Sequence, residues 1–253
     1  FDVFKTERET FEHMSKIFGK TTDELAGIFK TSRPAYDELA RAKFAKKGGI
    51  GYTQPSQETF PPMKDFLSWV KSCGAIPTEA WLDGTTKGES LGIKYMEASR
   101  EEGAEALNII PDRNWNIKDT EIRKIKIAKL AEAVAAAEKL EMPVFIGTEM
   151  NKAGQPFADD IDCGALAPHK QIFLKGAAIA AGHSILAKFA DTPYSGEKAS
   201  AEFKTTADKN TFFENVGRLP PLTKDIAGKL EKNSIEISFA KIADSAKFGK
   251  WKI

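Results

Sequence analysis

Three apolar segments of the sequence each end in a short polar stretch that carries a carboxylate. The stretches are Trp81-Leu82-Asp83-Gly84, Pro111-Asp112-Arg113-Asn114-Trp115 and Gly147-Thr148-Glu149-Met150-Asn151. Parallel strands of an α/β barrel present their catalytic and binding residues at their carboxyl ends, where the loops from several strands meet. The sequence therefore predicts one shared site that contains Asp83, Asp112 and Glu149.

The residue types in these stretches predict a small, anionic substrate. Glu149 and Asp112 are the candidate catalytic residues, because a carboxylate at a strand end can act as a general base. A guanidinium binds carboxylate or phosphate groups, and amides and aromatic rings can complete such a site. The candidate substrate-binding residues are Arg113, Asn114, Trp81 and Asn151. Each has a structural alternative: a Pro-Asp turn with a surface ion pair, a carboxylate that caps a backbone N–H, or a tryptophan in the core.

A divalent metal ion is the predicted cofactor. The candidate ligands are Glu149, Asp83 and His183. Carboxylate oxygens suit Mg²⁺ and Mn²⁺, and a histidine nitrogen also suits Zn²⁺, so these are the three candidate metals. Structural alternatives exist here too, since Asp83-Gly84 is a common turn pair and a histidine within a small-residue segment often forms a hydrogen bond in the core.

The elements that would position these residues follow a strand–helix pattern. Apolar runs predict strands at 75–81, 106–110 and 143–147. Helical periodicity predicts helices at 89–102, 119–140 and 168–189. Strands that alternate with helices of this length are typical of parallel βαβ units. The predicted fold class is therefore α/β, a TIM-like (β/α) barrel with added helices.

The chain is interpreted as one domain with three segments. Residues 1–73 form a helical segment or insertion, residues 74–190 contain the strand–helix repeat, and residues 191–253 are mostly helical.

Two local patterns predict details of the terminal segments. Thr21 and Glu24 have the spacing of a capping box, which marks a helix start. Near the other end, Ile235, Ile237 and Phe239 alternate with polar residues, which predicts a short strand that runs into a helix.

Composition restricts the partners and the location. The 37 basic and 36 acidic residues give a net charge of +1, so neither nucleic acid nor a membrane surface is a predicted partner. No apolar run reaches the roughly 18 residues of a membrane span, and the first residues lack a signal-peptide pattern. Two cysteines, Cys73 and Cys163, form no disulfide framework and indicate a cytoplasmic location. Motifs of nucleotide kinases, dehydrogenases, zincins and serine hydrolases are not found.

Three parts of the chain share their order and spacing with a known family. They are Arg33-Pro34 to Gly51-Tyr52, the run from Phe66 to Trp81 with Gly74-Ala75-Ile76-Pro77, and Ile146-Gly147-Thr148-Glu149-Met150-Asn151. They resemble the helical insertion, the segment before an Ala-His-Pro motif, and the Gly-Ser-Asp-x-His motif of the PHP (polymerase and histidinol phosphatase) family of metal-dependent hydrolases. The resemblance covers roughly half of the chain. It implies a distorted α/β barrel with metal ions held by His, Asp and Glu.

The chain departs from this family at two metal-ligand positions. Ala80-Trp81 stands in place of the His of Ala-His-Pro, and Asn151 stands in place of the final His. The family's N-terminal His-x-His motif is missing, so either the first strands of the barrel precede Phe1 in a longer chain or the chain is a divergent relative. The resemblance implies metal-dependent hydrolysis of a phosphoester. Two alternatives remain: a non-catalytic barrel that binds a small molecule or a partner, and a metal-assisted lyase or isomerase.

Overall fold

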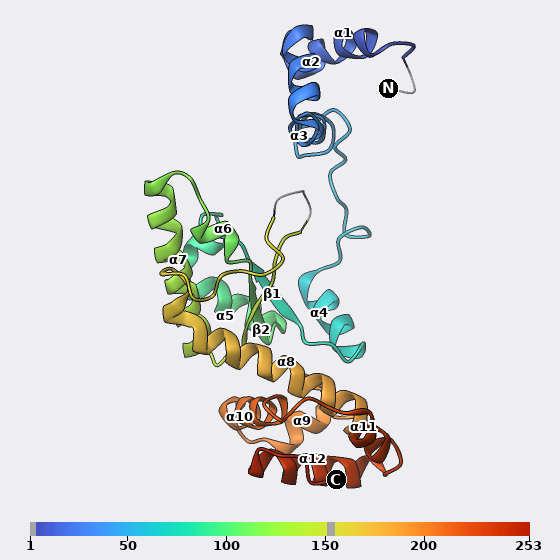
Figure 1. Cartoon of the computed structure of the whole chain (residues 1–253), viewed down its shortest axis with the longest axis vertical. Helices are drawn as coiled ribbons and strands as arrows, with labels where there is room; N and C mark the ends of the chain where they lie inside the picture. Colours follow the sequence, from blue (N-terminus) through green and yellow to red (C-terminus); the bar gives the residue numbers. More distant parts are fainter. Residues whose placement is uncertain (1–3, 151–154) are drawn as a thin grey trace. The chain divides into compact units, whose positions relative to one another are not determined.

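A computed structural model describes residues 4–150 and 155–253 of the chain (Figure 1). The chain divides into two compact units, Phe1–Pro61 (unit 1) and Pro62–Ile253 (unit 2). The two consecutive prolines at this division favour an extended backbone, because proline cannot continue a helix and restricts the residue before it. The boundary predicted after residue 73 instead lies inside unit 2.

Unit 1 consists of three helices, α1 (Glu7–Phe18), α2 (Thr22–Thr31) and α3 (Arg33–Phe44). Thr21 and Glu24 form the predicted capping box at the start of α2, so this prediction is confirmed. The buried core of the unit consists of Phe11, Phe18, Leu25 and Tyr36. The rings of Phe11 and Phe18 meet that of Tyr36 edge to face, an arrangement that the charge distribution of aromatic rings favours.

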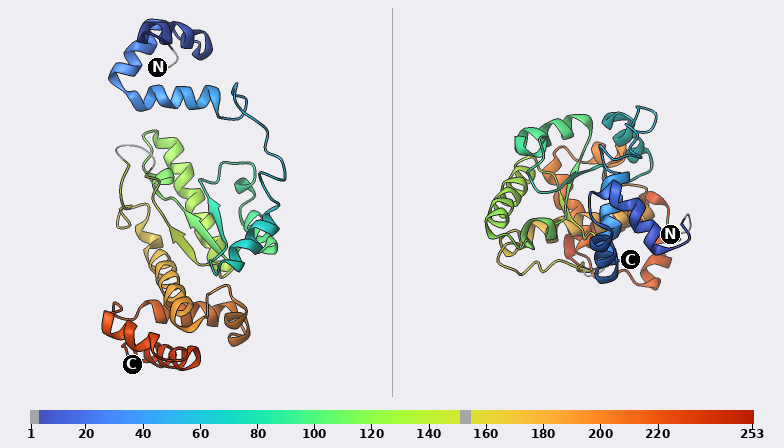
Figure 2. Two further views of the ribbon diagram at one scale, coloured as in Figure 1. Left: turned by 90° about the vertical axis from the view of Figure 1, so that its right-hand side faces the viewer. Right: turned by 90° about the horizontal axis from the view of Figure 1, so that it is seen from above.

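Unit 2 contains a sheet of three parallel strands, β1 (Thr78–Trp81), β2 (Ala106–Ile109) and β3 (Val144–Ile146), in the order β1-β2-β3. The register places Trp81 beside Ile109 and Leu107 beside Val144. The prediction of three neighbouring parallel strands is confirmed, and the left view of Figure 2 shows them side by side. Their carboxyl ends meet at one edge of the sheet, which we call the carboxyl edge, and their amino ends meet at the opposite, amino edge.

Helices surround this sheet in unit 2. They are α4 (Met63–Ser72), α5 (Ile93–Glu102), α6 (Asp112–Trp115), α7 (Thr120–Lys139), α8 (Lys170–Ala190), α9 (Glu197–Glu202), α10 (Thr206–Gly217), α11 (Lys224–Glu231) and α12 (Ile235–Phe248), with 3₁₀ turns η1 (Glu89–Leu91) and η2 (Ala167–His169). Leu107 and Ile109 of the sheet share one core with Met96 of α5 and Leu130 of α7. Helices α5 and α7 therefore cover the same face of the sheet.

Helix α8 lies against the outer edge of β3. Leu107 N–H donates to the carbonyl of Pro143, which therefore points toward β2. Successive carbonyls of a strand point in opposite directions, so the carbonyl of Val144 points away from β2. Gly176 of α8 lies next to this carbonyl, because a Cβ atom at Gly176 would be 1.9 Å from the Val144 oxygen.

The predicted TIM-like barrel is wrong. Helices predominate, and the part of the chain that the structure describes has one sheet of three strands, whereas a TIM barrel needs eight. The physical reason lies in α8, which occupies the place where a fourth parallel strand would pair with β3. The segment that follows α8 forms four further helices, and the residues predicted as a short strand near 235 belong to α12.

The expectation that no apolar run reaches the length of a membrane span is not confirmed for the segment that contains helix α8. Among the described residues, Ala167–Ala190 is long and apolar enough to cross a membrane by length and composition. In unit 2 this helix contacts β3, α10 and α12. Ile179 and Leu186 of α8 are fully buried with the side chains of the C-terminal helices. These contacts bury part of the helix, and 39% of its most apolar window lies inside the protein.

Candidate functional site

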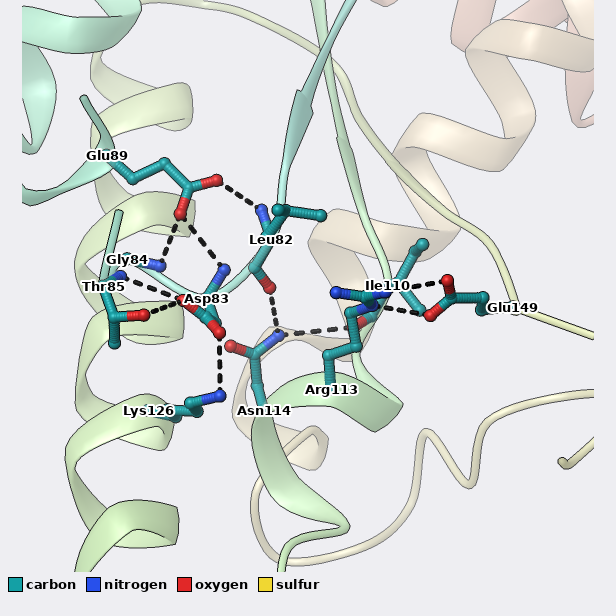
Figure 3. A network of polar contacts seen from close by, with 10 residues as sticks. All are labelled: Leu82, Asp83, Gly84, Thr85, Glu89, Ile110, Arg113, Asn114, Lys126 and Glu149. Atoms are coloured by element: carbon teal, nitrogen blue, oxygen red, sulfur yellow. Dashed lines mark hydrogen bonds and ion pairs between the residues drawn. The ribbon is translucent and has the colours of Figure 1, made fainter. Parts of the chain in front are cut away.

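One buried carboxylate holds the loop that follows β1. Glu89 is 5% exposed and accepts hydrogen bonds from the backbone N–H groups of Leu82 (2.6 Å), Asp83 (3.4 Å) and Gly84 (3.0 Å). Figure 3 shows these three donors converging on the carboxylate. Gly84 has a φ of +75°, which glycine adopts readily, so the chain can turn sharply here. The loop thereby directs Asp83 toward α7.

Asp83 forms an ion pair with Lys126 of α7. Lys126 Nζ donates to Asp83 Oδ2 at 2.7 Å, and Thr85 N–H donates to Asp83 Oδ1 at 3.0 Å. Burial raises the pKa of Asp83, but the hydrogen bonds from Lys126 and Thr85 more than offset this effect, so the pKa lies below its ordinary value. Asp83 is therefore an ionised carboxylate whose charge is balanced by a neighbouring ammonium.

Arg113 and Glu149 connect the ends of β2 and β3. Arg113 Nε and Nη2 donate to the two oxygens of Glu149 at 2.6 and 2.7 Å, which is a bidentate pair. The two side chains are 39% and 26% exposed, so solvent reaches the pair. The hydrogen bond to Glu149 raises the pKa of Arg113; burial lowers it, and the charges of Glu149 and Asp83 raise it further. The carboxylates that follow β1 and β3 thus act on the same guanidinium.

Asn114 ties the ends of β1 and β2 together from within. It is fully buried, and its Nδ2 donates to the carbonyls of Leu82 at 3.1 Å and Ile110 at 3.3 Å. Its Oδ1 has no hydrogen-bond donor among the described residues. Figure 3 shows this oxygen turned toward Asp83 and Lys126. A buried acceptor without a donor costs about 1–3 kcal/mol, so this position favours a donor from water or a ligand.

Asp159 provides a second acceptor of this kind. Trp115 Nε1 donates to Asp159 Oδ1 at 3.0 Å, whereas Asp159 Oδ2 is buried and has no donor within residues 4–150 and 155–253. Burial raises the pKa of Asp159 above its ordinary value, and the nearby charge of Asp112 raises it further, although the hydrogen bond from Trp115 acts in the opposite direction.

The structure brings together part of the predicted site. The residues that join the network at the carboxyl edge are Asp83, Arg113, Asn114 and Glu149. Asp112 lies beside this network, where it accepts a hydrogen bond from Asn116 at 2.8 Å. Its negative charge raises the pKa of the nearby Asp159. Trp81 is buried in the core, so its ring is not presented to a ligand. Asn151 lies outside the described residues.

Sequence reasoning missed three members of this region: Glu89, Lys126 and Asp159. Lys126 lies within a long helix, where a lysine is typical of a solvated face. Glu89 follows Thr86 by three positions, the spacing of a capping box, and the Glu89 N–H donates to Thr86 Oγ1 at 3.2 Å. That spacing was the one available signal.

The arrangement of these side chains does not support the predicted metal-binding site. Asp83 and Glu149 are bonded to Lys126 and Arg113, so protein cations stand beside the predicted ligands. His183 lies in α8 and is not part of the network. In the described portion of the chain, no group of three or more His, Cys, Asp or Glu side chains could hold a metal ion.

His183 instead has a structural contact that predicts a pH effect. Its Nδ1 accepts the backbone N–H of Tyr194 at 3.0 Å, and burial lowers the pKa of His183 below its ordinary value of 6.5. The folded state thus binds this proton less readily than the unfolded state, so the stabilising contribution is complete above pH 6.5 and is lost as the pH falls below it. We expect the free energy of unfolding to fall from pH 7 to pH 5.5 by less in His183→Gln than in the wild type.

Urea unfolding at both pH values measures this difference. His13→Gln serves as the control, because His13 belongs to unit 1, and it should reproduce the wild-type dependence. An unchanged pH dependence in His183→Gln would show that this histidine does not carry the effect.

Comparisons of the chain with protein-family models, curated proteins and solved structures find no match. What the carboxyl edge can do therefore follows from its own geometry. Arg113 offers a guanidinium that solvent reaches, and Asn114 and Asp159 offer buried acceptors elsewhere in the same region.

Proposed function

We propose that the carboxyl edge of unit 2 binds a small molecule that carries a carboxylate. In this proposal the carboxylate of the ligand takes the place of Glu149 on Arg113. The observation that supports this proposal is the bidentate ion pair between Arg113 and Glu149, which is partly exposed to solvent. The proposed function is ligand binding rather than metal-dependent hydrolysis.

The energetics of the pair favour an exchange of this kind. The guanidinium already holds one carboxylate in planar, two-bond geometry, which a ligand carboxylate can reproduce without rearrangement of Arg113. The pair is partly exposed, so solvent screens the attraction between Arg113 and Glu149 and a ligand carboxylate can compete for the guanidinium. The neighbouring Asp83–Lys126 pair is neutral as a whole and does not repel an anion.

Two buried acceptors in the region of the carboxyl edge favour a ligand that also has hydrogen-bond donors. Asn114 Oδ1 and Asp159 Oδ2 lack donors among the residues described, and in this proposal a hydroxyl group of the ligand supplies one. A small hydroxycarboxylate combines both features. We therefore expect glycerate to bind better than acetate, and glycerol, which has no carboxylate, not to bind.

Two substitutions in the pair should have opposite effects on glycerate binding. Arg113→Gln removes the anion partner and should abolish binding, whereas Glu149→Gln removes the competing carboxylate and should tighten binding about fivefold, which corresponds to about 1 kcal/mol. Isothermal titration calorimetry with glycerate measures both. The matched control is Arg218→Gln, which breaks a comparable Arg–Glu pair with Glu214 on α10 and should leave binding unchanged.

Two results would contradict the proposal. Binding that survives Arg113→Gln would remove the guanidinium from the site. Weaker binding in Glu149→Gln would show that Glu149 contacts the ligand rather than competing with it.

A further inference from the structure

A second polar cavity lies at the amino edge of the sheet, at the opposite end of the strands from Arg113. Its volume is about 200 Å³, and residues that directly precede β2 and β3 form one wall. The side chains that matter here belong to Lys71 of α4, Arg100 of α5, Glu105 before β2 and Lys209 of α10. The cavity is thus lined by groups from four separate parts of unit 2.

Positive charge exceeds negative charge around this cavity. Lys71, Arg100 and Lys209 are three cations, and Glu105 and Glu141 are the two carboxylates in its lining. Glu105 is shared, because Lys71 Nζ lies 2.9 Å from its Oε1 and Lys209 Nζ lies 3.1 Å from its Oε2. One carboxylate therefore serves two ammonium groups.

Arg100 is the third cation of this cavity, and Glu105 does not balance its charge. Within the described residues it has no ion-pair partner, although it lines the same cavity. Like charges that converge without enough counter-charge repel one another, and a bound anion relieves this repulsion. A guanidinium can also bind an oxyanion through two parallel hydrogen bonds.

The far wall of the cavity is held in place by buried contacts. Lys209 Nζ lies 4.0 Å from the centre of the Tyr194 ring and also donates to the Tyr194 carbonyl at 3.3 Å. The Tyr194 hydroxyl donates to Asn210 Oδ1, and Asn210 Nδ2 donates to the Glu141 carbonyl at 2.8 Å. The position of Lys209 is therefore set before any ligand arrives, which lowers the entropy cost of binding.

We propose that this cavity binds a phosphate group through Arg100, Lys71 and Lys209. Phosphate matches the site better than a carboxylate does, because it can accept from three cations at once and carries more charge. The volume suits a phosphate group with little attached to it. This site is separate from the carboxylate site at the carboxyl edge and does not depend on it.

The test is calorimetric titration of inorganic phosphate at constant ionic strength. Wild-type protein should bind phosphate saturably, and Arg100→Gln and Lys71→Gln should each weaken binding about tenfold or more, as expected for loss of a charge-assisted hydrogen bond. The control Arg8→Gln makes the same change of charge in unit 1, at a side chain that is exposed and paired with Glu12, and should leave binding unchanged. Arg113→Gln should also leave phosphate binding unchanged.

A second arm uses glycerol 3-phosphate to identify the source of the phosphate group. Equal affinity for both probes assigns the site to small phosphate monoesters, and preference for inorganic phosphate assigns it to the free ion; both agree with the proposal. Absence of saturable binding, or equal weakening by Arg8→Gln and Arg100→Gln, would overturn it. Thermal unfolding of each variant without phosphate confirms that it is folded, and Arg100 is an exposed side chain whose replacement should not disturb the fold.

Discussion

Gly217→Ala is expected to destabilise unit 2 by about 3 kcal/mol, or roughly 6–12 °C in Tm for a protein of this size. Helices α8 and α10 touch through their backbones at this point. A Cβ atom at Gly217 would be 1.7 Å from the carbonyl oxygen of Ala178 and 2.9 Å from the backbone nitrogen of Gly182. No rotation of a side chain can relieve these contacts, so the two helices must separate and lose packing along their length.

The matched control for this substitution is Gly228→Ala. Gly228 lies inside helix α11, and a Cβ atom there would meet nothing within 4 Å. Alanine should stabilise that helix by about 0.5–1 kcal/mol, because it has the higher helix propensity. Thermal and urea unfolding of both variants measures the difference. If the two substitutions had the same effect, the close crossing of α8 and α10 would not exist.

Glu89→Gln is expected to cost about 2–3 kcal/mol of stability, because an amide nitrogen would replace one of two oxygens that accept buried backbone N–H groups. The new NH₂ group is a donor and would face another donor. The backbone amides of Leu82 and Gly84 should then exchange with solvent faster. Urea unfolding gives the loss of stability, and hydrogen exchange locates it in the loop after β1.

A control for Glu89→Gln is available on the surface of α7. Glu121 pairs with Lys124 and is exposed, so Glu121→Gln should change stability by less than about 0.5 kcal/mol. Glu89→Gln should also weaken the binding of glycerate, because the loop it holds connects to Asn114 through the Leu82 carbonyl. Wild-type exchange rates at Leu82 and Gly84 in the variant would contradict this role for Glu89.

The sequence predicted the sheet better than it predicted the architecture. The three strands were located because their apolar runs lie between helical patterns, and each observed strand falls within the predicted range. The barrel was predicted on the assumption that this strand–helix repeat continues in the rest of the chain. Its failure has a local cause: Gly176 lets α8 approach β3, and a single glycine in a helix gives no sign of what it contacts. Near residue 235 a short alternation suggested a strand, but Ser234 caps a helix there.

The candidate site was predictable where chemistry and strand ends coincide. Arg113 and Glu149 were found because polar residues follow buried strands, but their pairing depends on the register of two strands, which periodicity does not give. Lys126 contributes from a helix 43 positions after Asp83, a relation visible only in three dimensions. His183 was predicted as a metal ligand, and the structure shows its Nδ1 accepting the backbone N–H of Tyr194; sequence surroundings do not distinguish these two roles.

The position of α8 also covers the edge of the sheet at which a strand from another molecule could pair. The outer edge of a sheet exposes backbone groups that can pair with a strand from another molecule, which leads to aggregation. Many proteins protect such an edge with charged residues or proline on the strand itself. Here β3 is apolar, and its protection comes from Gly176, more than thirty residues later, because the lack of a side chain lets a helix lie on the Val144 carbonyl. We therefore expect this edge to resist pairing with other molecules, because the absence of a side chain at Gly176 lets α8 cover it.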